Sequence, residues 1–71
     1  MDTYEELKRN LIRACYWYYV KAEPIMSDYS YDHLIYDLKK MELDRGIADE
    51  DSPTQIIWGG RDEQYPDWAK I

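Results

Sequence analysis

Apolar side chains recur at steps of three and four along the first third of the chain, which is the spacing of one face of a helix. The stripe follows a Thr3–Glu6 pair with the spacing of a capping box, and it consists of Tyr4, Leu7, Leu11, Ala14, Tyr18 and Ala22. Pro24 ends the pattern, because proline lacks an amide hydrogen and disfavours helix at the residue before it. The pattern predicts a helix over about residues 3–22.

A second helical stripe follows Ser27, which is a natural N-cap, with Asp28 in the first turn. Its apolar members are Tyr31, Leu34, Ile35, Leu38 and Met41. Gly46 suits a left-handed C-terminal cap. This pattern predicts a helix over about residues 28–44, with Asp32 and Glu42 among the residues assigned to its solvent-facing sides.

Residues 47–71 lack helical periodicity and are interpreted as an irregular C-terminal arm. The arm opens with the acidic loop ADEDSPTQ, and Ile56, Ile57 and Trp58 are expected to pin it across the two helices. Pro53 and Pro66 suit the first positions of short helical turns. The expected fold is therefore all-α: an antiparallel helical hairpin with an irregular arm and short extra helical turns, forming one domain over residues 1–71.

Composition narrows the classes of function. The formal net charge of −6 opposes binding to a phosphate backbone, so direct nucleic-acid binding is not expected. One cysteine, Cys15, excludes an internal disulfide, and no cluster of metal-ligand residues accompanies it. The apolar runs are too short to cross a bilayer and no secretory signal precedes them, so a cytoplasmic setting is expected.

The side chains best suited to ligand binding are concentrated between residues 16 and 32, in the stretch YWYYVKAEPIMSDYSYD. The spacing of Asp28, Tyr31 and Asp32 places them on one helical face. A tight connection between the two helices would bring them to the preceding tyrosines, and tyrosine rings with two carboxylates suit a planar cation. Two plainer interpretations stay open: Tyr18 and Tyr31 as core residues, and Asp28 as a helix-stabilising first-turn carboxylate.

These residues resemble a known family. YYVKAEPIMSDYSYDHLIYDLKKME, followed by DSPTQ and a glycine pair, is similar to the N-terminal Ia domain of bacterial-type NAD⁺-dependent DNA ligases. The motif combines tyrosines before a proline-containing turn, D-x-x-Y-D-x-L and S-P-T-Q, and the similarity extends over about residues 7 to 60. After the glycine pair, RDEQYPDWAKI departs from the family linker and is interpreted as a natural end.

The resemblance implies a function in NAD⁺ binding. In the family this domain closes over the nicotinamide mononucleotide (NMN) half of NAD⁺ and promotes attack by a lysine of the next domain. The contacts carry over to Tyr18, Asp28, Tyr31 and Asp32. Tyr19 stands where the family usually has histidine, a departure expected to weaken or alter contacts with the ligand's phosphate or ribose. Ile56 stands where the family often has arginine, which removes another basic group. NAD⁺, through its NMN moiety, is the implied cofactor.

No enzyme activity is expected of the chain by itself. None of its lysines lies in the K-x-D-G motif that carries the ligase nucleophile. The resemblance therefore implies a non-catalytic module that works with or on the adenylation domain of a ligase, as a split-ligase piece or a modulator, in DNA replication or repair. A chain this short would suit a phage.

Two other hypotheses compete with nucleotide binding. In the first, the chain has lost the nucleotide and is a protein–protein interaction module that docks through its tyrosine and tryptophan side chains. Trp17, Trp58 and Trp68 are the candidates for that partner surface. In the second, the chain is an acidic mimic of nucleic acid, but its scattered charges give this little support. No membrane partner is expected.

Overall fold

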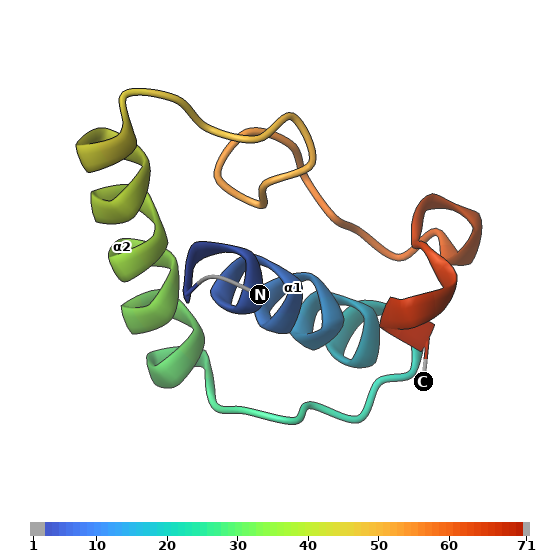
Figure 1. Ribbon diagram of the computed structural model, residues 1–71. Helices are drawn as coiled ribbons and strands as arrows, with labels where there is room; N and C mark the ends of the chain where they lie inside the picture. Colours follow the sequence, from blue (N-terminus) through green and yellow to red (C-terminus); the bar gives the residue numbers. More distant parts are fainter. Residues whose placement is uncertain (1–2, 71) are drawn as a thin grey trace.

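The computed structural model describes residues 3–70 and contains, within them, helices and turns but no strand. Helix α1 (Thr3–Cys15) continues into a short π-helix, η1 (Tyr16–Val20), and helix α2 (Asp28–Arg45) follows. Two 3₁₀ turns, η2 (Asp62–Gln64) and η3 (Asp67–Lys70), lie near the end of the arm. Figure 1 shows α1 between α2 on one side and the C-terminal turns on the other. The prediction of an all-α fold with short extra turns is confirmed.

The contacts between α1 and α2 run in antiparallel order. Tyr4, near the start of α1, donates a hydrogen bond to Glu42, near the end of α2, at 2.7 Å. Leu11 packs with Leu38 in the same buried cluster, and both are fully buried. At the other end of the pair, the Sγ atom of Cys15 lies 3.0 Å from the Tyr31 hydroxyl. The apolar stripes of the sequence therefore meet along one seam.

The first helix ends in a way that the sequence pattern did not indicate. The α-helical geometry stops at Cys15, and the next turn is a π-helix in which the amide of Lys21 donates to the carbonyl of Tyr16 at 3.2 Å. Ala22 then adopts φ 57°, the left-handed region, and the amide of Glu23 donates to the carbonyl of Trp17 at 2.8 Å. This wide closing turn directs the chain toward α2.

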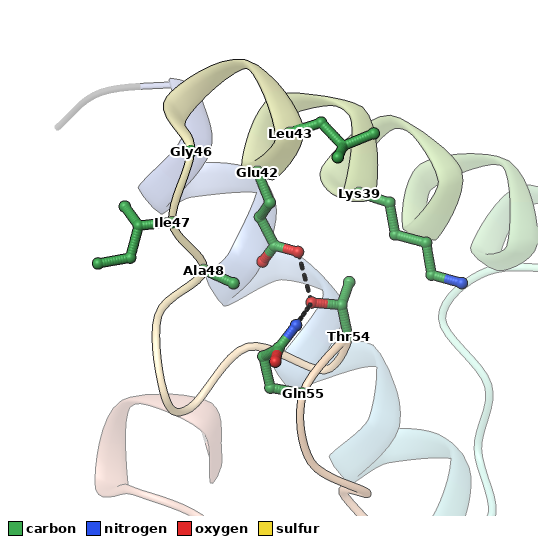
Figure 2. A pocket seen from close by; sticks show the side chains of 8 residues that line it. All are labelled: Lys39, Glu42, Leu43, Gly46, Ile47, Ala48, Thr54 and Gln55. Atoms are coloured by element: carbon green, nitrogen blue, oxygen red, sulfur yellow. Dashed lines mark hydrogen bonds between the residues drawn. The ribbon is translucent and has the colours of Figure 1, made fainter.

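Glu42 is buried and binds the arm to α2. The sequence-based assignment of Glu42 to a solvent-facing side of the helix is therefore wrong. The side chain is 8% exposed and accepts hydrogen bonds from Tyr4, from Ser52 at 2.6 Å and from Thr54. Glu42 follows Leu38 by four residues, so it lies on the same face of α2 as that core residue. Figure 2 shows Glu42 pointing from α2 toward Thr54 of the arm.

Lys8 holds the acidic loop from the side of α1. It is 5% exposed, and its ammonium group lies 2.8 Å from Asp49, 2.9 Å from Asp51 and 3.3 Å from Glu5. Burial works to lower the pKa of Lys8, but the hydrogen bonds to these three carboxylates outweigh it and raise the pKa above its ordinary value. The lysine therefore stays charged and holds the first half of the loop through Asp49 and Asp51.

The end of the arm packs on the opposite side of α1. Trp58, Tyr65 and Ala69 form a buried cluster with Ile12 and Tyr16. Trp58 donates from Nε1 to the carbonyl of Asp51 at 2.8 Å, and Tyr65 donates to the carbonyl of Gly59 at 2.7 Å. Trp58 thus pins the arm as expected, whereas its neighbours Ile56 and Ile57 are 41% and 89% exposed and do not.

Candidate functional site

A pocket of about 270 Å³ opens between η1 and the first turns of α2. All five side chains predicted to bind the cofactor line it: Tyr18, Tyr19, Asp28, Tyr31 and Asp32. The rest of the lining is apolar or weakly polar and consists of Ala14, Cys15, Pro24, Ile25 and Met26. The volume is slightly below the range of roughly 300–1,000 Å³ for ligand pockets. It therefore suits part of a dinucleotide rather than the whole.

The π-helix presents two adjacent tyrosine rings to this pocket. Consecutive side chains of an α-helix point roughly 100° apart, so neighbours rarely line the same pocket. In η1, however, both Tyr18 and Tyr19 do so, and their ring centroids lie 4.8 Å apart with an interplanar angle of 75°. Tyr18 is 44% and Tyr19 56% exposed. Part of each side chain is therefore accessible to a ligand, and π-helical turns often occur at functional sites.

Tyr31 contributes a ring from α2 at the inner side of the pocket. It is half-buried, and its hydroxyl meets the Cys15 thiol at 3.0 Å. Burial, followed by the hydrogen bond to Cys15, raises the pKa of Tyr31 well above its ordinary value, and burial likewise raises the pKa of the Cys15 thiol. Both groups therefore stay protonated near neutral pH, so they can position a ligand but are unsuited to act as nucleophiles.

Asp28 and Asp32 place two exposed carboxylates on the first turns of α2. Their separation of four residues puts them one above the other on the face that lines the pocket. The turn itself is fixed by Ser27, whose hydroxyl accepts from the amide of Ser30 at 3.1 Å. The helix is thus capped by Ser27, and the carboxylates remain available to the pocket.

The chemistry of the pocket favours a flat, positively charged ligand. Three tyrosine rings line it, and aromatic faces attract cations by about 0.5–2 kcal/mol. Two carboxylates add a negative potential and accept hydrogen bonds. No group of three or more histidine, cysteine, aspartate or glutamate side chains within residues 3–70 is arranged to hold a metal ion.

The three tryptophans predicted to form a partner surface are mostly covered. Trp58 is 7% exposed and belongs to the core. Trp17 is half-buried and meets the Tyr16 ring edge-on, with centroids 6.1 Å apart. Trp68 is half-buried beneath the guanidinium of Arg9, which lies 5.1 Å from the ring centroid. Trp17 and Trp68 pack against the same buried cluster that contains Trp58, and none of the three rings is fully exposed.

Sequence reasoning missed Cys15 as part of the pocket and Glu42 as the anchor of the arm. Helical spacing gives only part of the signal: Cys15 precedes Tyr18 by three residues and Tyr19 by four, and Glu42 follows Leu38 by four. The contacts that bury these two residues, with Tyr31 and with Ser52, join separate parts of the chain.

A second, more open pocket lies where the arm leaves α2, and Figure 2 shows its exposed Leu43 and Ile47 side chains directed away from the Glu42–Thr54 contact. It contains none of the predicted cofactor-binding residues.

Comparison with known proteins points to the same family as the sequence motifs. The family described as "DNA ligase-like, N-terminal NAD⁺-binding domain" matches residues 1–58. DNA ligase of Chlorobium luteolum is 38% identical over 65 residues, which cover 87% of this chain and 9% of the ligase. DNA ligase of Petrotoga mobilis is 42% identical over 59 residues, with 82% and 9% covered. DNA ligase of Synechococcus is 47% identical over 58 residues, with 80% and 8% covered.

The chain therefore spans less than a tenth of the length of these relatives. No solved structure matches it. Within the described residues, neither helix combines the length and the apolar character that a membrane crossing requires.

Proposed function

The chain belongs to the DNA ligase-like, N-terminal NAD⁺-binding domain family, and from this membership we propose that it binds the NMN half of NAD⁺ in the pocket between η1 and α2. One observation carries the proposal: Tyr18, Tyr19, Asp28, Tyr31 and Asp32, drawn from two helices, all line that pocket. In this proposal the module is non-catalytic and works with or on the adenylation domain of an NAD⁺-dependent DNA ligase.

The proposed contacts follow from the chemistry of oxidised nicotinamide, which is a flat pyridinium cation. The Tyr18 and Tyr31 rings provide aromatic surfaces for the cation. Asp32 accepts hydrogen bonds from the carboxamide, and Asp28 accepts one from a ribose hydroxyl. Charge-assisted hydrogen bonds of this kind are the stronger class in proteins.

The isolated module is expected to bind weakly. Its pocket of about 270 Å³ covers only part of the ligand, and the remaining contacts belong to the adenylation domain in this proposal. A dissociation constant near 1 mM, or about −4 kcal/mol, is therefore expected. The low affinity would confine tight binding to the assembled pair of domains.

A titration followed by NMR tests the proposal. NMN and NAD⁺ should shift the signals of the pocket residues at millimolar concentration, whereas AMP, which lacks the pyridinium, should not. Asp32→Ala should weaken NMN binding by at least about tenfold, since hydrogen bonds to charged groups contribute roughly 1.5–3 kcal/mol. Asp44→Ala is the matched control, because Asp44 is an exposed carboxylate of the same helix that does not line the pocket.

The proposed cooperation with an adenylation domain has its own test. The chain is added to an NAD⁺-dependent ligase from which the N-terminal domain has been removed, and formation of the adenylated enzyme from NAD⁺ is measured. Recovered adenylation that Asp32→Ala abolishes supports the proposal. No recovery, with NMN binding intact, would contradict the cooperation and leave the nicotinamide pocket in place.

The protein–protein docking hypothesis predicts the opposite pattern. If millimolar NMN shifts no NMR signal of the chain, this hypothesis is favoured. Asp32→Ala would then have little effect on binding to the protein partner. The tryptophans offer this hypothesis little surface, because Trp58 is buried and Trp17 and Trp68 are half-buried. Its remaining support is a set of exposed tyrosines: Tyr18, Tyr19, Tyr29 and Tyr36.

A further inference from the structure

The lining of the nicotinamide pocket carries negative charge and no compensating cation. Its ten residues include two carboxylates, Asp28 and Asp32, and no lysine, arginine or histidine. NMN differs from nicotinamide riboside by a phosphate group, which carries about −1.5 to −2 charge near neutral pH. A ligand that places this group near two carboxylates must overcome repulsion, whereas the pyridinium nucleoside alone is attracted.

Five basic side chains lie near the pocket residues in the sequence, and none of them belongs to the pocket lining: Lys8, Arg9, Arg13, Lys21 and His33. Lys21 follows the pocket tyrosines directly, but its ammonium lies 5.8 Å from the ring centroid of Tyr16, which is buried outside the pocket lining. Lys8 is held by the acidic loop, and Arg9 lies 3.0 Å from Glu5. His33 lies 3.8 Å from Asp37.

The N-terminus of α2 does not supply the missing positive charge either. Free amides at a helix N-terminus attract anions. Here the Ser27 hydroxyl already accepts from the amide of Ser30, and Asp28 occupies the first turn. The helix end is therefore capped and faced by a carboxylate.

We propose that this pocket selects a phosphate-free pyridinium nucleoside, nicotinamide riboside, over NMN. The inference rests on the proposed nicotinamide site and refines it: the chain's own residues bind the pyridinium and the ribose. The negative charge of the phosphate of NMN or NAD⁺ must then be neutralised by a cation from outside this pocket. That cation is either a basic side chain of a partner or a metal ion bound to the phosphate.

A calorimetric or NMR titration of the unmodified chain with both ligands measures the selectivity. Nicotinamide riboside should bind about 3- to 10-fold more tightly than NMN at low ionic strength, since charges several ångströms apart at an exposed site interact weakly but measurably. The difference should shrink when salt is raised to about 0.5 M, because the Debye length falls below about 5 Å. A difference independent of salt would contradict an electrostatic origin.

A charge placed at the pocket wall tests the mechanism. Tyr19→Lys introduces a cation at an exposed lining position, and it should raise the ratio of NMN affinity to riboside affinity about 3- to 10-fold. Tyr29→Lys is the matched control: it changes the net charge equally at a side chain that is 83% exposed and lies outside the pocket lining. An equal rise in both variants would overturn the local explanation.

The possible failures are distinguishable. If both ligands bind and NMN binds as tightly as the riboside or more tightly, the selectivity is wrong and the nicotinamide site stands. If neither ligand shifts any signal at millimolar concentration, the proposed function fails and this inference falls with it.

Discussion

Among single residues, Glu42 shows how a buried carboxylate becomes a structural anchor. Burial alone works to raise the pKa of Glu42, but hydrogen bonds from Ser52, Thr54 and Tyr4 outweigh it and lower the pKa below its ordinary value of 4.5. The ionised form is therefore favoured in the folded state. A carboxylate of this kind stabilises the protein above its ordinary pKa and loses that contribution as the pH falls through its folded-state pKa.

We therefore expect the free energy of unfolding to decrease as the pH falls below about 4.5. Glu42→Gln should flatten this decrease, and it should destabilise the protein by roughly 1–3 kcal/mol at neutral pH because the hydroxyl network loses its charged acceptor. Urea unfolding between pH 3 and 7 measures both effects. Glu50→Gln changes the net charge equally at an exposed position in the arm, and an identical pH profile for the two variants would contradict the role of Glu42.

Among the structural elements, η1 and the turn after it decide the shape of the site. The π-helical turn presents both Tyr18 and Tyr19 to the pocket, and Ala22 closes it in the left-handed conformation. An L-residue in this conformation costs about 1–2 kcal/mol, which is why glycine is common there. This strained residue lies in the connection between η1 and α2, which places the start of α2 beside Tyr18 and Tyr19.

Ala22→Gly should accordingly stabilise the protein. Relief of the left-handed strain, about 1–2 kcal/mol, exceeds the entropic cost of glycine in the unfolded chain, about 0.4–1 kcal/mol, so a net gain of roughly 0.5–1 kcal/mol is expected. Chemical denaturation measures the gain. Ala14→Gly is the contrasting control, since Ala14 lies inside α1, and it should destabilise by about 1 kcal/mol or more. The same sign for both substitutions would be inconsistent with strain at position 22.

At the level of the whole molecule, the end of the arm completes the core. Residues beyond 58 lie outside the region that matches the family, yet Tyr65 and Ala69 are 4% and 0% exposed against Ile12 and Tyr16. The Tyr65 ring lies 5.1 Å from that of Tyr16 and 5.0 Å from that of Trp58. Figure 1 shows these last turns beside the end of α1 that leads into η1. They therefore support the helix that carries the pocket.

Tyr65→Ala should cost about 3–5 kcal/mol, because it removes a large buried ring. A chain of this size is stabilised by only roughly 4–10 kcal/mol in total, so thermal unfolding should show a large loss. Tyr65→Phe keeps the ring and removes the hydrogen bond to Gly59, so it should cost only about 1 kcal/mol. Equal, small effects of both substitutions would mean that the arm does not contribute to the core.

The sequence allowed the five predicted pocket residues to be named because their positions follow helical spacing and because all but Tyr19 match a family motif. Helical spacing places Asp28 and Asp32 on one face wherever α2 lies, and the tyrosines precede the same turn. Cys15 was not predicted as part of the lining, because its place depends on how far α1 is buried against Tyr31. The proposed preference for the nucleoside over NMN could not be inferred from the sequence either, because it rests on the absence of basic side chains from the pocket lining.

Local patterns determined the helices, their caps and the apolar seam, because these depend on residues three and four apart and on single capping side chains. Gly46, for example, adopts the expected left-handed φ of 75° at the end of α2. Only the tertiary structure decided the π-helical turn, the burial of Glu42 and Lys8, and the packing of Tyr65 on α1. The burial of Glu42 and Lys8 and the packing of Tyr65 depend on contacts between residues far apart in the chain, which helical spacing alone does not specify.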